Sequence, residues 1–284
     1  MLWENLREEE FEKAVEISKG VCVMPIGCIE MHGQHLPVGT DFKTSEYIAK
    51  EADKIEPVCI FPTFKFGDVQ GLTRWKGSVI LSVELEQRLL TELCSEIARN
   101  GFKKIVLLNG HGGNTALLGN FVRSTQHDKK DYVVLARNDF CYGVTELVRD
   151  LDNGVKFPEL TDEDKKYVRD FVYNKKQYGH GGINETSIMM HITPDLVRLD
   201  RMHEVDGVST QKADYLHEVG FNMTSRLWSI NQPNSYHGHH PEGANARIGN
   251  VLLQKRIEIQ AEACRRLKMD DRVLQWNDEW NNAW

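Results

Sequence analysis

Several features are scarce or absent in this 284-residue sequence, and each absence excludes certain classes of function. No apolar run approaches the roughly 20 residues of a membrane-spanning helix, and the acidic N-terminal decapeptide does not resemble a secretory signal. The 35 lysines and arginines are outnumbered by 42 aspartates and glutamates, which gives a formal charge of −7. Because nucleic acids and anionic membranes attract clustered basic residues, we expect neither as a partner, and we expect a cytoplasmic protein.

Cysteine pairing motifs are absent as well. The six cysteines are scattered and none forms a C-x-x-C pair: Cys22, Cys28, Cys59, Cys94, Cys141 and Cys264. Three of them lie in or beside apolar runs that look like strands. This distribution indicates reduced, mostly structural thiols.

The first half of the chain alternates short apolar runs with helical patterns. Strands are predicted at residues 21–26, 58–61, 105–108 and 132–136. Between them, helices are predicted at 43–56, with Ile48, Ala52 and Ile55 on one face, and at 84–100, with Leu85 and Ile97 on one face. Strands separated by helices indicate parallel βαβ units, so we expect an α/β fold with a mainly parallel sheet.

The second half is less regular, and we expect it to belong to the same single domain spanning 1–284. Residues 150–178 are polar and charged and are predicted to be an insertion. Residues 232–245 are predicted to be a loop, and 246–267 an amphipathic helix. The C-terminal tail holds Trp276, Trp280 and Trp284, which we expect to pack on this subunit or on a neighbouring one.

A first cluster of chemically active residues follows the first predicted strand: Glu30, His32, His35 and Asp41. Ligand sites of parallel sheets lie at the carboxyl ends of strands. Imidazole with carboxylate is a ligand set for Zn²⁺, Mn²⁺ or Fe²⁺, whereas Mg²⁺ and Ca²⁺ favour oxygen alone. The alternative is a polar loop whose histidines cap backbone groups, but four such residues within a dozen favour a metal site.

Two further motifs carry similar side chains. His111 lies in N-G-H-G-G-N directly after the third predicted strand, where a tight turn or a phosphate-binding loop is the alternative. Glu185 opens an apolar helical run after His180, where an acid favoured by the helix dipole is the alternative. Three loops that each offer histidine or carboxylate groups make coincidence a poor explanation.

Other residues are candidates for contact with a substrate. Ser78, close to Trp75, offers a hydroxyl or a backbone N–H, although it equally suits the start of a strand. The Tyr-His-Gly-His-His-Pro loop with His237, His239 and His240 suits a further metal-binding tract, a substrate lid or an ordinary exposed surface. Asp68 is open to both functional and structural interpretations.

These motifs resemble the creatininase (creatinine amidohydrolase) family. The pattern G-x-x-E-x-H-G-x-H-L-P-x-G-T-D, then N-G-H-G-G-N, then H-x-G-x-x-E-T-S occurs in order within residues 25–41, 109–114 and 180–187. The resemblance implies a three-layer αβα fold, a homo-oligomer such as a hexamer, and two divalent ions (Zn, Mn or Fe) per chain. It implies His180 as the proton-shuttling histidine, Asp41 as the bridging ligand, and as metal ligands Glu30, His32, Asp41, His111 and Glu185.

One departure from the family concerns the substrate. Members that act on creatinine carry an aromatic residue and an acid after the motif histidine, whereas this chain has Gly112 and Gly113. Creatinine is therefore a poor candidate. The residues expected to contact the substrate are Ser78, Trp75, Gly112, Gly113 and His239.

The predicted function is a binuclear metal-dependent hydrolase that uses metal-activated water, with His180 and Glu185 as catalytic residues. It would cleave a C–N bond in a small cyclic amide, formamide or related polar metabolite. An alternative is a metal-dependent C–C hydrolase that opens a cyclic diketone such as a keto-inositol. A third interpretation is a non-catalytic binding protein on the same fold.

Overall fold

The computed structural model describes residues 1–224 and 226–283. Its first half contains α1 (Phe11–Ser18), β1 (Val21–Ile26), α2 (Thr40–Ile55), β2 (Cys59–Ile60), α3 (Val83–Arg99), β3 (Lys104–Asn109), α4 (Asn114–Ser124) and β4 (Val133–Asn138). Its second half contains α5 (Val144–Asp152), α6 (Asp162–Tyr173), α7 (Ile183–Ile192), α8 (Asp214–His217), α9 (Arg226–Asn231), α10 (Ala246–Met269) and α11 (Arg272–Asn282).

The four strands form one parallel sheet in the order β2-β1-β3-β4. β1 and β3 pair along their whole length, from Val21 opposite Lys104 to Ile26 opposite Asn109. β3 and β4 pair in the same way, whereas β2 contributes only Cys59 and Ile60. The parallel α/β architecture predicted from the sequence is therefore confirmed, with a shorter second strand than expected.

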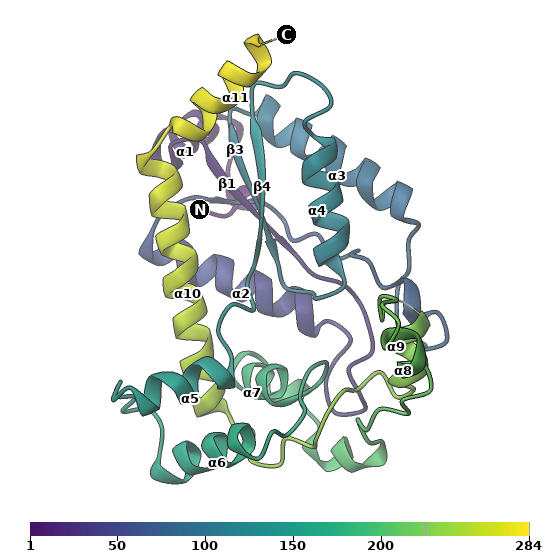
Figure 1. The fold of residues 1–284 in the computed structure, drawn as a ribbon. Helices are drawn as coiled ribbons and strands as arrows, with labels where there is room; N and C mark the ends of the chain where they lie inside the picture. Colours follow the sequence, from purple (N-terminus) through teal and green to yellow (C-terminus); the bar gives the residue numbers. More distant parts are fainter. Residues whose placement is uncertain (225, 284) are drawn as a thin grey trace.

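Helices cover both faces of the sheet (Figure 1), so the central strands β1 and β3 are buried along their whole length, whereas the edge strand β4 is partly exposed. Side chains alternate along β1, so Val21 and Val23 join one apolar cluster with residues of α2, α7 and α10. Met24 and Ile26 join another cluster with residues of α1, α3 and α4. This arrangement is the expected three-layer αβα sandwich.

Two helical faces differ from those predicted. On α3 the buried residues are Leu90, Cys94 and Ile97, whereas Leu85 is 43% exposed. Leu85 lies in the first turn beside its capping residue Ser82, before the helix reaches the apolar cluster. On α2, Ile55 is half exposed because it is the last helical residue.

The segment 150–178 packs into the same core as its surroundings. α6 lies within this segment, and its Val168 and Phe171 belong to the apolar cluster that includes α10. Thr161 and Asp164 form a reciprocal capping box at the start of α6. That the chain forms one domain and that this segment is an insertion stay predictions.

The C-terminal helices are anchored by polar contacts. α10 begins at the predicted residue, and the buried Lys104 donates to the Leu267 carbonyl and the Asp271 carboxylate beyond it. On α11, Asn277 and Asn281 each donate to the Lys130 carbonyl at 2.7 Å.

Two tryptophans of the tail are more than half exposed on this subunit. Trp276 is 58% exposed and Trp280 is 59% exposed, because α11 docks through its asparagine side. Packing of these tryptophans on this subunit or on a neighbouring one therefore stays a prediction. Trp284 lies outside the described residues.

Two sequence-based expectations about the whole chain can be compared with the structure. All six cysteines are free thiols, five of them buried and Cys141 exposed. Among the residues described, no helix has the length and apolar character needed to cross a membrane.

Candidate metal centre

The three motifs converge at the carboxyl edge of the sheet. Glu30 and His32 follow β1, His111 follows β3, and Glu185 lies in the first turn of α7. Asp41 lies in the first turn of α2, because this helix starts at Thr40 and not at the predicted 43. A Cβ on Gly27 would lie 2.3 Å from the Phe42 backbone nitrogen, so only glycine lets β1 end against the start of α2.

Asp41 lies between two groups of potential ligands, with one carboxylate oxygen toward each. Its Oδ2 is 2.8 Å from Nδ1 of His111, and its Oδ1 is 3.0 Å from Nε2 of His32. Glu185 Oε2 lies 3.6 Å from the same His32 nitrogen. One ligand set thus consists of His32, Asp41 and Glu185, and a second contains Asp41 with His111.

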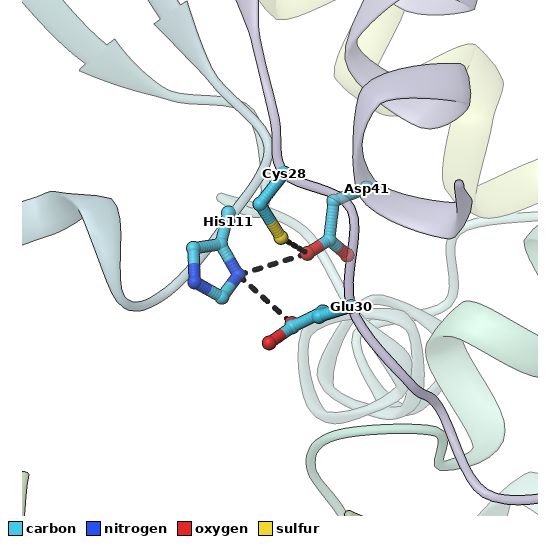
Figure 2. A group of neighbouring side chains, drawn as sticks. All are labelled: Cys28, Glu30, Asp41 and His111. Carbon is cyan, nitrogen blue, oxygen red and sulfur yellow. Dashed lines mark hydrogen bonds and ion pairs between the residues drawn. The ribbon is translucent and has the colours of Figure 1, made fainter. Parts of the chain in front are cut away.

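Figure 2 shows the second set, in which three side chains surround Asp41. His111 Nδ1 lies 3.1 Å from Glu30 Oε1. Cys28 donates a hydrogen bond from its thiol to Asp41 Oδ2 over 3.0 Å. One potential ligand atom from each of Cys28, Glu30, Asp41 and His111 lies within 4.8 Å of the others.

Hydrogen bonds to the backbone set the tautomers of both histidines. His111 Nε2–H donates to the Asp68 carbonyl at 3.0 Å, and His32 Nδ1–H donates to the Glu30 carbonyl at 3.1 Å. The opposite nitrogen of each ring therefore faces the carboxylates. This is how proteins orient histidine ligands of metals. Asp68, whose role the sequence left open, acts here through its main-chain oxygen.

The carboxylates strongly favour positive charge in the centre. Burial opposes a charged His32, but Asp41, Glu185 and Glu30 overcome this effect and raise its pKa to about 10. Burial likewise opposes a charged His111, yet Glu30 and Asp41 raise its pKa well above the usual range. For Asp41, burial would raise the pKa, but the two histidines hold it well below its ordinary value.

One buried atom of the centre lacks a hydrogen bond within the described part of the chain. Glu30 Oε1 has no hydrogen-bond partner, although ring nitrogens of His111 and His180 lie 3.1 and 3.3 Å from it. A buried carboxylate oxygen without a partner is costly unless a cation satisfies it. Nitrogen and carboxylate ligands in this spacing fit divalent transition-metal ions.

His180 lies beside the ligands in a fixed orientation. Its ring stacks on His32 with centroids 3.9 Å apart, and its Nε2–H donates to the Met31 carbonyl at 2.6 Å. Its Nδ1 therefore faces Glu30. Glu185 Oε2 accepts a hydrogen bond from the Gly181 N–H at 2.6 Å, which ties the His180 loop to α7.

His35 is part of the first motif but not of either ligand set. It is buried, and its Nε2 contacts the Gly181 carbonyl and the Thr186 hydroxyl, both at 3.0 Å. Burial lowers its pKa to about 4 in spite of the Gly181 carbonyl. His35 therefore joins the 30–41 loop to α7 as a neutral residue.

Two of the predicted substrate residues lie close to the motif loops. Val79 N–H donates to the Ile29 carbonyl at 3.0 Å, which places the adjacent Ser78 against the first motif. The Ser78 hydroxyl oxygen is buried with no hydrogen-bond partner in the parts of the chain that are described. Trp75 packs on the apolar cluster that contains Cys28 and Leu72.

The other three predicted substrate residues differ in their exposure and in the space around them. Gly112 is exposed, with open space where a side chain would begin. A Cβ on Gly113 would lie 2.3 Å from His111 Nε2, so glycine is required there. His239 is exposed and accepts a hydrogen bond from the Gln177 N–H at 3.0 Å, and within the described residues no hydrogen bond or ion pair joins it to the ligands.

Three residues near the centre were missed by sequence reasoning. Cys28, only two residues before Glu30, is not singled out from the other cysteines by the sequence analysis. Ser235 donates to the Met31 carbonyl at 2.8 Å beside His180, and Trp228 of α9 packs edge-on against His180 at 5.3 Å. Position in the motif was a usable signal for Cys28, whereas the other two come from distant segments with no motif of their own.

Sequence comparisons show what the chain is similar to. The family model described as "Creatininase: Creatinine amidohydrolase" matches residues 4–264. Creatinine amidohydrolase from Pseudomonas putida is 25% identical over 210 residues, which cover 70% of this chain and 74% of that protein. The mycofactocin precursor peptide peptidase of Mycolicibacterium smegmatis is 25% identical over 186 residues, which cover 63% of this chain and 61% of the peptidase.

Solved structures share the fold. A structure described as "Creatininase Mn" superposes with a TM-score of 0.71 at 19% identity, covering 93% of this chain and 97% of that one. A mutant creatininase described as "Zn-Zn type" gives a TM-score of 0.69 at 19% identity over the same shares. With the family match extending over nearly the whole sequence, the chain belongs to the creatininase family and is one of its metal-dependent hydrolases.

Proposed function

We propose that this protein is a binuclear metal-dependent hydrolase of a C–N bond in a small cyclic amide, formamide or related polar metabolite. The observation that carries the proposal is the position of Asp41, whose two oxygens each lie in a different ligand set. One set would hold an ion through His32, Asp41 and Glu185. The other would hold an ion through Glu30, Asp41 and His111.

The charge of the centre suits this chemistry. Three carboxylates, Glu30, Asp41 and Glu185, face two neutral imidazoles, so the ligands carry roughly three negative charges against the four positive charges of two divalent ions. Two bound divalent ions supply a Lewis acid and lower the pKa of a coordinated water toward neutrality. Two ions held in this way stabilise an anionic nucleophile and a developing oxyanion, which is expected of a catalytic site more than of a structural one.

His180 is placed to move a proton. Because its Nε2–H is held by the Met31 carbonyl, the Nδ1 lone pair points to the ligand cage beside Glu30. This nitrogen can accept a proton at the cage and return it to the leaving nitrogen of the substrate. Ser235, 3.4 Å from Nε2, and Trp228 limit the movement of the ring.

Two observations support an amide substrate other than creatinine: the lack of space at Gly113, and the names of the relatives. Since a side chain at position 113 would collide with His111, the acid found there in creatinine-cleaving members has no space, and creatinine stays a poor candidate. Amidohydrolase and peptidase relatives both have names that describe C–N cleavage, which favours an amide substrate over the cyclic diketone alternative.

The experiment is a substrate panel on purified protein of measured metal content. The protein is stripped with a chelator, reloaded with Zn²⁺ or Mn²⁺, and tested on lactams, formamides, short peptides, creatinine and keto-inositols. We expect metal-dependent C–N cleavage of at least one amide. C–C cleavage alone, or a fully loaded protein that turns over no member of the panel, would contradict the proposal.

Paired variants provide the control. Asp41→Asn should lose metal and turnover together, because it removes the charge shared by both ligand sets. Asp68→Asn should retain both, because Asp68 contacts His111 through its main-chain carbonyl and its side chain accepts only from the nearby Gln70 N–H among the described contacts.

A further inference from the structure

We propose that Cys28 supplies a sulfur ligand to the ion held by Glu30, Asp41 and His111, which makes this position selective for Zn²⁺ over Mn²⁺. The inference rests on the proposed function, because both require a metal ion at this place. It goes further by assigning the fourth ligand and the metal preference of one of the two positions.

The geometry places the sulfur among the other ligand atoms. Cys28 Sγ lies 3.0 Å from Asp41 Oδ2, and His111 Nδ1 lies 2.8 Å from the same oxygen. In tetrahedral zinc sites, bonds of about 2.0 Å to nitrogen or oxygen and about 2.3 Å to sulfur separate neighbouring ligand atoms by roughly 3.3–3.5 Å. A small outward shift of these side chains would therefore bring all four ligand atoms to bonding distance of one ion, with the activated water as a fifth ligand.

An independent observation points to the same position. Glu30 Oε1, buried and without a hydrogen-bond partner in the described structure, belongs to the same four-residue group as the Cys28 sulfur. Figure 2 shows the Cys28 sulfur turned toward the Asp41 oxygen that His111 also contacts. The group thus combines a Glu30 carboxylate oxygen that needs a cation with a Cys28 sulfur that faces the neighbouring Asp41 carboxylate.

The surroundings distinguish Cys28 from the other buried cysteines. Cys22, Cys59 and Cys94 belong to the apolar cluster on one face of the sheet. Cys28 is fully buried too, but it touches an aspartate and lies at the end of β1 between this aspartate and Leu72. A structural thiol does not require a carboxylate partner.

The chemistry is a simple ligand exchange. The Cys28 thiol releases its proton to solvent, a sulfur–metal bond forms, and one water leaves the hydrated ion. No oxidant or reductant takes part. Thiolate is a soft ligand that favours Zn²⁺, whereas Mn²⁺ prefers oxygen, so loss of the sulfur should affect Zn²⁺ binding more strongly.

Spectroscopy on the intact protein tests the ligand directly. X-ray absorption of the zinc-loaded wild type should contain a sulfur scatterer at about 2.3 Å. The cobalt-loaded protein should show sulfur-to-cobalt charge-transfer absorption in the near ultraviolet. Cys28→Ser should remove both signals, and the exposed-thiol control Cys141→Ser should keep both.

Metal competition tests the selectivity. Cys28→Ser should raise the Kd for Zn²⁺ about tenfold or more and change the Kd for Mn²⁺ by less than about threefold. Equal losses of affinity for the two ions would overturn the proposed selectivity for Zn²⁺.

The outcomes separate this inference from the proposed function. Zinc that is lost in Asp41→Asn but shows only nitrogen and oxygen scatterers in the wild type overturns the Cys28 ligand alone. A wild type that binds no zinc dependent on Asp41 overturns the proposed function as well. Should Cys28→Ser fail to fold, the wild-type absorption spectrum still decides the question.

Discussion

At the scale of single residues, the direction of each side chain decides its chemistry. His32 and His35 are three positions apart in one motif, yet they do different things. His32 directs Nε2 to Asp41 and Glu185, whereas His35 directs Nε2 to the Gly181 carbonyl. The sequence predicted both histidines in one cluster but did not separate the histidine that joins two loops from the histidine that faces the carboxylates.

Glu185→Gln should reduce the metal content from two ions to about one per chain. Glutamine keeps an oxygen for the Gly181 N–H but removes the charge that faces His32, while Glu30, Asp41 and His111 remain. Elemental analysis of the purified variant measures this loss. Retention of both ions would show that Glu185 is not a ligand.

His35 should make the metal-free protein sensitive to acid. Its pKa is lowered from 6.5 to about 4 in the folded state by burial, so its contribution to stability is complete above pH 6.5 and is lost as the pH falls toward 4. About 2.5 pKa units correspond to roughly 3 kcal/mol. Urea unfolding at pH 7 and pH 4, with chelator present, measures the effect.

The variant His35→Gln should reduce this acid sensitivity, because an amide N–H can still donate to the Gly181 carbonyl but does not titrate. His203→Gln is the matched control, since His203 is largely exposed. If the free energy of unfolding depended equally on pH in the wild type and in His35→Gln, the lowered pKa of His35 would be contradicted.

At the scale of elements, the apolar pattern located most helices and strands but not their first residues. α2 was expected from 43 and begins at Thr40, and this difference places Asp41 on the helix. The reason is that Thr40 and Asp41 are polar yet buried by the ligand centre, so hydrophobic periodicity does not include them. Leu85 shows the opposite case of an apolar residue left exposed in a first turn.

Asn245→Ala should destabilise the protein by about 1–2 kcal/mol. The Asn245 side-chain oxygen accepts from the Arg247 and Ile248 N–H groups at the start of α10, and its amide donates to Asp164. This residue therefore joins the caps of two helices. Chemical denaturation measures the loss.

Asn245→Ser provides the comparison, because a serine oxygen can still cap the helix but cannot reach Asp164 as the amide does. The free energy of unfolding of Asn245→Ser should lie between those of the wild type and Asn245→Ala. An alanine variant within about 0.5 kcal/mol of wild type would indicate that the cap contributes nothing measurable.

At the scale of the whole molecule, the ligands and the tryptophan-rich helix are separated. α5 to α9 gather at one end, and α11 lies at the other (Figure 1). α11 is docked through Asn277 and Asn281, and its Trp276 and Trp280 side chains are more than half exposed. Large exposed aromatic residues of this kind are typical of interfaces.

The combined variant Trp276→Ser and Trp280→Ser should lower the mass of the assembled protein, because it removes apolar area without removing the anchoring asparagines. Light scattering measures the mass. Tyr173→Ser, which changes an exposed aromatic residue on α6 at the other end, is the control. An unchanged mass in the tryptophan variant would reject a subunit contact through α11.

The sequence by itself determined the layered fold, the family and the five ligand-type residues. This was possible because strands and helices have different apolar periods, and because the ligands lie within a few residues of strand and helix ends. The tertiary structure decided which atoms meet. Only the packing of β1 against α2 and of α7 against the first motif placed the two oxygens of Asp41 toward different histidines, brought Cys28 to the centre and turned His35 away. Side-chain direction depends on helix starts and on contacts between distant segments, which a local pattern does not contain.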